Sequence, residues 1–187
     1  MTLGGWIALA VAAALVLLLV VMYNRLVGLN QRSRAAWSDI DVQLKRRADL
    51  VPSLVEIVKG YAAHERKTFD EVTRLRTVAL SARSPEERAQ SENQLSQALR
   101  GLFAVAEAYP DLKASANFQA LQGQLSGIED AAQSARRYYN AVVRDLNTAI
   151  ETFPSTVIAG TFRFHPRQFF ELDRPEDRQV PRIAFDR

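Results

Sequence analysis

The stretch FQALQGQLSGIEDAAQSARRYYNAVVRDLNTAIETF, residues Phe118 to Phe153, decides the fold of this chain. Its apolar residues recur at alternating intervals of three and four: Phe118, Leu121, Leu125, Ile128, Ala132, Ala135, Tyr139, Val142, Leu146, Ala149 and Phe153. This spacing predicts one helix, about 54 Å long, with a continuous apolar seam. Because such a seam stays dry only against other long helices lying nearly parallel to it, the stretch predicts a helical bundle.

The N-terminal stretch predicts a membrane anchor. Residues 1–24 carry no charged side chain, and the apolar run within them covers about 32 Å as a helix, the thickness of a hydrocarbon core. A cleaved signal peptide is the alternative, but no Lys or Arg precedes the run, and the run is longer than a signal-peptide core. The anchor residues are expected to include Leu3, Trp6, Leu15, Leu19 and the interfacial aromatic Tyr23.

The charges that flank this anchor predict its orientation. Arg25, Arg32 and Arg34 follow the apolar run, whereas only the α-amino group precedes it. The positive-inside rule therefore predicts a single-pass protein of the cell membrane, with its N-terminus outside and the rest of the chain in the cytoplasm.

Helix start and stop signals divide the remainder of the chain. The anchor helix is expected to continue to about Arg47. A link from Arg47 to Pro52 is expected to follow it, and a second helix is expected to start there and reach Ala79. Ser84-Pro85-Glu86-Glu87 forms a capping box that starts a third helix, which ends at Tyr109-Pro110. Pro154 stops the fourth helix, the one quoted above.

The expected fold is therefore all-α: a long antiparallel four-helix bundle whose N-terminal transmembrane helix is continuous with helix one. The expected domains are the anchor at residues 1–24, a cytoplasmic bundle at 25–154, and an aromatic and arginine-rich tail at 155–187. Within the tail, residues 180–185 are expected to add one short extended piece.

The composition excludes several functional classes. The 187 residues include no cysteine, which excludes disulfides and thiolate metal sites. The net charge is only +3, and basic residues are interspersed with acidic ones, which is typical of a solvated surface and argues against nucleic acid as a partner.

No catalytic or metal-binding motif is complete. His64-Glu65 begins a zincin motif, but Thr68 stands where the second histidine would have to be. Asp39 and Asp41 are two residues apart on a helix, so they point to different sides and cannot pair as acid and base. No catalytic, cofactor or metal residue is therefore predicted. An enzyme whose site is assembled between helices remains an alternative, because such sites leave weak traces in a sequence.

A stripe of small residues runs along the fourth helix, away from its apolar seam: Ala120, Gly123, Gly127, Ala131 and Ser134. Each glycine costs about 1 kcal/mol relative to alanine inside a helix, so a close approach by another helix is a reasonable compensation. The hypothesis is a homo-oligomer interface at Ala120, Gly123, Gly127 and Ala131. The alternative is that these residues lie on a solvent-exposed surface with no binding role, or at the edge of an ordinary contact within the bundle.

The start of the tail, FRFHPRQFF, alternates phenylalanines with basic residues. Aromatic and arginine side chains together are typical of membrane interfaces and of interaction hot spots. The candidate contacts with lipid or a membrane partner are Phe162, Arg163, Phe164, Arg167, Phe169 and Phe170. Equally open is a fold-back of these side chains over the end of the bundle.

Three runs resemble the LemA family: AWSDIDVQLKRRADLVPSLVEIVKGYAAHE (Ala36 to Glu65), LFAVAEAYPDLKASANFQAL (Leu102 to Leu121) and ARRYYNAVVRDLNTAIETFP (Ala135 to Pro154). The resemblance implies an N-terminal membrane anchor, a cytoplasmic bundle of long helices and no established catalytic activity. It also implies an association with membrane zinc metallopeptidases of the HtpX type.

Taken together, these features predict a non-enzymatic, membrane-anchored scaffold or accessory protein that assembles with itself and binds a membrane partner. Two alternatives stay open, a hidden enzyme and a lipid-responsive sensor domain.

Overall fold

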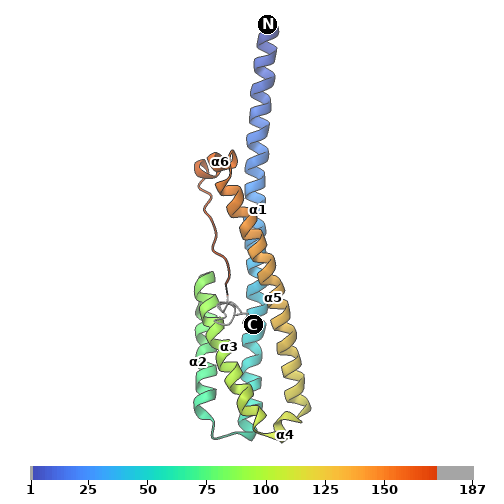
Figure 1. Cartoon of the computed structure of the whole chain (residues 1–187), viewed down its shortest axis with the longest axis vertical. Coiled ribbons are helices and arrows are strands. Elements are labelled where there is room, and N and C mark those ends of the chain that lie inside the picture. Colours follow the sequence, from blue (N-terminus) through green and yellow to red (C-terminus); the bar gives the residue numbers. More distant parts are fainter. Residues whose placement is uncertain (1, 172–187) are drawn as a thin grey trace, which may run out of the picture. The chain divides into compact units, whose positions relative to one another are not determined.

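The computed structural model describes residues 2–171, and every regular element in that range is a helix (Figure 1). The elements are α1 (Leu3–Tyr61), α2 (Arg66–Ser81), α3 (Pro85–Glu107), α4 (Pro110–Lys113), α5 (Ala116–Glu151) and α6 (Ser155–Thr161). The all-α class is confirmed, and so is the continuity of the apolar N-terminal helix with the first helix that follows it. The extended piece expected at residues 180–185 lies outside the described residues.

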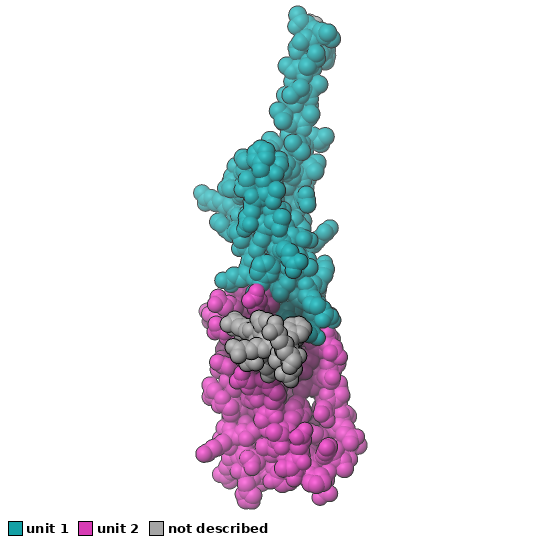
Figure 2. Space-filling model, in the orientation of Figure 1, with its two compact units in different colours: residues 1–41, 133–169 teal, residues 42–132, 170–187 magenta. Residues whose placement is uncertain are grey.

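The chain divides into two compact units, coloured separately in Figure 2. In its described part, unit 1 comprises residues 2–41 and 133–169, and unit 2 comprises residues 42–132 and 170–171. Helices α1 and α5 each contribute to both units. The domain limits expected after residues 24 and 154 remain predictions.

Unit 2 buries one apolar core between its helices. The side chains of this core come from all five helices of the unit: Val51, Leu54 and Val58 from α1, Phe69, Val72 and Leu75 from α2, Leu95, Leu99 and Leu102 from α3, Leu112 from α4, and Phe118 and Leu125 from α5. In α3 these positions recur every three or four residues, so one face of the helix is apolar and meets α2 beside it (Figure 1). Unit 2 is thus a helical bundle.

The seam predicted along α5 is buried nearly as expected. Of its eleven residues, Phe118, Leu125, Tyr139, Val142 and Leu146 are buried, and five more are half-buried. The exception is Phe153, which is 78% exposed, because α5 ends at Glu151 and the chain turns before reaching it.

The start of α3 matches the predicted capping box. The hydroxyl of Ser84 accepts a hydrogen bond from the backbone N–H of Glu87 at 3.1 Å, and the Glu87 carboxylate accepts from the N–H of Ser84 at 3.4 Å and of Arg83 at 3.0 Å. These backbone donors hold the pKa of Glu87 below its ordinary value. The capping box therefore confirms this helix start.

The predicted break between the first and second helices is wrong. Residues 47–52 are continuous α-helix, and α1 ends only at Tyr61, before a short turn that leads to α2 at Arg66. Pro52 lies inside α1, where it removes one backbone N–H and leaves the carbonyl of Ala48 without its usual donor. Such a carbonyl needs another partner, because Ala48 is fully buried.

Arg76 of α2 supplies that partner. Its Nε donates a hydrogen bond to the Ala48 carbonyl oxygen at 2.6 Å, and its Nη2 lies 3.9 Å from the Asp49 carboxylate. A side chain from the neighbouring helix thus satisfies the group that proline released, and the helix can run through Pro52. The sequence signal for a helix end was real, but a tertiary contact overrides it.

Replacing Arg76 with methionine is expected to destabilise unit 2 by about 1–3 kcal/mol, because a buried carbonyl loses its donor. In a Pro52→Ala background the cost should shrink, since the new N–H of residue 52 can donate to Ala48 instead. A double-mutant cycle by urea unfolding measures this coupling. Arg74→Met, at an exposed site on the same helix, is the matched control. An equal cost of Arg76→Met in both backgrounds would contradict the role assigned to Arg76.

Candidate functional site

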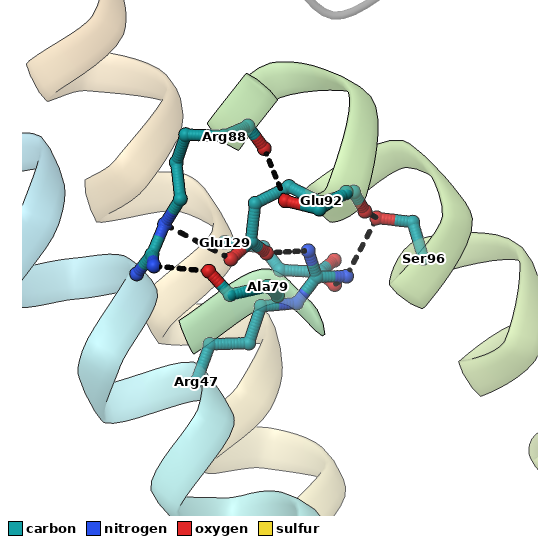
Figure 3. Close-up of polar contacts among 7 residues, drawn as sticks. Arg47, Ala79, Arg88, Glu92, Ser96 and Glu129 are labelled. Atoms are coloured by element: carbon teal, nitrogen blue, oxygen red, sulfur yellow. Dashed lines mark hydrogen bonds and ion pairs between the residues drawn. The ribbon is translucent and has the colours of Figure 1, made fainter. Parts of the chain in front are cut away.

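A cluster of charged side chains is buried in unit 2 (Figure 3). The cluster consists of Arg47 from α1, Arg88 and Glu92 from α3, and Glu129 from α5. Arg47, Arg88 and Glu92 are 7%, 4% and 1% exposed, whereas the Glu129 side chain is 52% exposed. Two cations and two anions therefore meet at one place, three of them almost out of reach of water.

Arg47 joins three helices. Its Nη1 lies 3.3 Å from Oε2 of Glu92, and its Nη2 donates to Glu129 at 3.0 Å and to the hydroxyl of Ser96 at 2.9 Å. The fork of a guanidinium group suits such divergent partners, which an ammonium group could not satisfy with the same geometry. Arg47 thus sets the register of α1 against α3 and α5 within unit 2.

Arg88 serves the end of another helix. Its Nη1 donates to the carbonyl of Ala79, one of the last carbonyls of α2, and its Nε lies 3.5 Å from Oε1 of Glu92. The last carbonyls of a helix lack partners within the helix, and a cation near them is favourable. The two arginines and two glutamates of the cluster balance in charge, which is typical of a structural device rather than of a reactive site.

In unit 1, the segment that follows α6 packs back along α1 and α5. The Arg167 guanidinium donates to the side-chain oxygen of Asn30 in α1 at 3.0 Å, while its backbone N–H donates to the amide oxygen of Asn147 in α5 at 2.8 Å. The Asn147 amide donates in return to the Arg167 carbonyl at 2.9 Å. One residue of the tail thus links α1 and α5 within this unit.

Tyr139 makes a second link to the tail. Its hydroxyl donates to the carbonyl of Gln168 at 2.9 Å, and its ring lies 5.6 Å from that of Trp37 on α1. Burial raises the pKa of the Tyr139 hydroxyl above its ordinary value, and the Arg167 cation offsets part of this rise. The hydroxyl therefore remains a hydrogen-bond donor at neutral pH.

Aromatic rings gather at the C-terminal end of the apolar run. The ring of Tyr23 lies 4.7 Å from that of Phe162 and 6.1 Å from that of Phe164. Phe164 also packs against the apolar cluster of unit 1, which is formed by Leu26, Leu146, Ile150, Ile158 and Ala159. This cluster closes unit 1 at the level where the apolar N-terminal run ends.

A Schellman motif ends α6. The N–H of Phe164 donates to the carbonyl of Ala159 at 2.9 Å, and that of Arg163 donates to Gly160 at 3.3 Å. The motif needs a left-handed residue, and Arg163 takes that conformation with φ 57° where glycine is the usual choice.

The predicted contact residues of the tail have different surroundings. Phe162 and Arg163 are exposed, Phe164 and Arg167 are half-buried, Phe169 is 39% exposed and Phe170 is buried. The predicted anchor residues Leu3, Trp6, Leu15, Leu19 and Tyr23 are all exposed. The tail therefore has two kinds of residue. Phe164, Arg167 and Phe170 are at least half-buried, as the fold-back alternative predicts, whereas Phe162 and Arg163 stay on the surface.

The small-residue stripe of α5 lies on the surface. Ala120, Gly123, Gly127, Ala131 and Ser134 are exposed. A Cβ added at Gly123 or Gly127 would meet nothing within 4 Å. Within the described part of the chain, no close helix contact compensates for these glycines.

Residues considered for catalysis are dispersed. His64 and Glu65 are exposed in the turn between α1 and α2, and Asp39 and Asp41 are exposed on α1. Over residues 2–171 there is no group of three or more His, Asp or Glu side chains that could hold a metal ion.

The charged cluster was missed by the sequence reasoning, although a signal for it exists. Arg88 and Glu92 continue the spacing of Leu95, Leu99 and Leu102 toward the start of α3, so both stand on the apolar face of that helix. Arg47 likewise falls on the buried face of α1. Charged residues at core positions of two helices were the available clue, because buried charges are normally paired.

The fold and these clusters define an all-helical protein with an apolar N-terminal segment. This segment is long enough to cross a membrane, and its most apolar 18 residues are not buried by any described part of the chain. The model of the LemA family matches residues 36–185, and the chain belongs to the LemA family.

Curated relatives cover most of the chain. Magnetosome protein MamQ 2 of Paramagnetospirillum magneticum is 23% identical to it over 184 residues, which cover 84% of this chain and 68% of that protein. Protein LemA of Metamycoplasma hominis is 28% identical over 145 residues, or 75% of this chain and 65% of that protein. Magnetosome protein MamQ of Magnetospirillum gryphiswaldense is 23% identical over 183 residues. The apolar helix and these relatives fit a membrane-associated protein, and none of the names denotes a catalytic activity.

Proposed function

We propose that this protein is a non-enzymatic scaffold or accessory subunit, anchored in the cell membrane, whose helical domain assembles with itself and holds a membrane partner. The observation that carries the proposal is the exposed small-residue stripe on α5, where two glycines face open space. A helix interior keeps such glycines at a cost of about 1 kcal/mol each, which the close approach of a helix from a second copy would offset.

The proposed orientation places the N-terminus outside and the helical domain in the cytoplasm. It rests on Arg25, Arg32 and Arg34, which follow the apolar run, while no Lys or Arg precedes it. All three arginines lie on α1 within or near its first turns beyond the apolar run, where the positive-inside rule has its strongest effect.

Self-association is tested with a matched pair of variants of the full-length protein. Gly127→Trp is expected to lower the mass of the assembly, measured by mass photometry after mild extraction, because the bulky ring prevents close approach at the stripe. Gly101→Trp on α3 is the control. At Gly101, as at Gly127, an added Cβ would meet no atom within 4 Å, so neither substitution should disturb the fold of the single chain. An unchanged mass for Gly127→Trp, or an equal loss for both variants, would remove the stripe as the assembly surface.

The partner proposed from the family resemblance is a membrane metallopeptidase of the HtpX type. Native mass spectrometry of the extracted complex tests it, because a bound peptidase adds a defined mass to that of the assembly. Recovery of the assembly with no peptidase mass, under conditions in which the two are produced together, would count against this partner and leave self-association standing.

A further inference from the structure

The segment from Phe153 to Arg163, which contains α6, carries an apolar surface that no other described part of the chain covers. Phe153, Val157 and Phe162 are 78%, 59% and 58% exposed. Two other side chains of the same short helix are buried, since Ile158 and Ala159 are 5% and 1% exposed. The segment thus has some apolar side chains that are buried within unit 1 and others that stay largely exposed.

Contacts within unit 1 fix where the segment lies. Ile158 and Ala159 belong to one buried cluster with Leu26 of α1, Met22 packs against this cluster, and the ring of Phe162 lies 4.7 Å from that of Tyr23. Figure 1 shows α6 beside α1 at the end of α5. These α1 residues end the apolar run, so α6 lies where a bilayer crossed by that run would pass from hydrocarbon to headgroups.

We propose that the α6 segment is a second membrane contact, with Phe153, Val157 and Phe162 inserted into the interfacial region of the bilayer. Aromatic side chains are favoured in that region, and the Arg163 guanidinium can pair there with lipid phosphate. Arg163 has a left-handed backbone conformation that favours glycine. Unlike glycine, arginine has a cationic side chain that can bind lipid phosphate.

Lipid suits this surface better than a protein partner does, because the surface adjoins the apolar run of α1. The most apolar 18 residues of α1 are not buried by any described part of the chain and form a surface suited to a bilayer, and α6 packs at the end of that run. Charge agrees as well, since Arg25, which follows the apolar run, and Arg163, which follows α6, are both exposed. The inference rests on the anchoring part of the proposed function and is independent of self-association and of any protein partner.

The absence of cysteine allows a direct test on the full-length protein. Single cysteines at Val157, at Leu15 in the span and at Tyr138 on α5 are labelled with an environment-sensitive fluorophore after reconstitution into mixed phosphatidylcholine and phosphatidylglycerol vesicles. All three side chains are more than half exposed, so the substitutions should leave folding intact, which circular dichroism checks. Quenching by lipids that carry nitroxide at defined acyl depths, and by aqueous iodide, then reports the depth of each site.

The inference expects shallow-lipid quenching and blue-shifted emission for Val157→Cys, deep-lipid quenching for Leu15→Cys, and quenching by iodide alone for Tyr138→Cys. If Val157→Cys behaves like Tyr138→Cys while Leu15→Cys is quenched by lipid, the inference is overturned and the anchor stands. Protection of Val157→Cys from both lipid and iodide would overturn it in favour of a protein contact. Loss of lipid quenching at Leu15→Cys would refute the anchor itself.

Discussion

Replacing Glu92 with alanine is expected to destabilise unit 2 by about 3–5 kcal/mol, because the change removes the buried carboxylate that lies close to both buried guanidinium groups. Glu92 is 1% exposed and lies 3.3 Å from Arg47 and 3.5 Å from Arg88. After its removal, the remaining carboxylate of the cluster belongs to Glu129, which is half exposed and bonds to Arg47 alone among the described residues.

The measurement is thermal unfolding of the full-length protein in detergent micelles, followed by circular dichroism. For a chain of this size the expected loss lowers the Tm by roughly 6–20 °C. Glu129→Ala is the control, since it removes the same kind of group from the same cluster at a solvated position and should cost about 0–1 kcal/mol. Equal Tm shifts for the two variants would show that burial does not determine how much each carboxylate of the cluster stabilises unit 2.

Two arginines placed in the apolar run are expected to abolish membrane insertion. Each arginine near the centre of a transmembrane helix costs about 2.5–3.5 kcal/mol of insertion free energy, so Val11→Arg with Leu15→Arg should cost about 5–7 kcal/mol together. Both side chains are more than half exposed, and no part of the apolar window is buried. The loss should therefore affect anchoring and not the packing of the helical units.

Fractionation of cells that produce the variant measures this effect. The wild-type chain should resist carbonate extraction, while the double variant should leave the membrane fraction. Val42→Arg with Tyr138→Arg is the matched control, because it replaces two exposed apolar residues outside the run and should leave the protein in the membrane. A double variant of the run that stays resistant to carbonate would refute the transmembrane assignment.

Periodicity predicted the longest elements well because it is a local property. The seam of α5 was expected from Phe118 to Phe153, and the helix runs from Ala116 to Glu151. The capping box at Ser84 placed the start of α3 for the same reason, since its hydrogen bonds join residues three apart. Neither prediction required knowledge of what packs against these helices.

Predictions that depended on distant partners failed or were left open. The expected link at residues 47–52 is helical because Arg76, from the next helix, bonds the carbonyl that Pro52 leaves free. Helix α6 was not expected, because it has only seven residues and its stability comes from packing Ile158 and Ala159 against α1. The ion pair of Arg47 with Glu92 was not expected either, because it joins residues that are 45 positions apart in the chain.

The amino-acid sequence by itself determined the helical class, the apolar span and the family, because each of these follows from composition, from spacing along the chain or from matched runs of residues. Only the tertiary structure decided where α1 ends, which charges are buried and which part of the tail remains on the surface. The physical reason is that a proline inside a helix, an arginine at a core position or an exposed phenylalanine acquires its energy from groups that the chain brings close only when it folds.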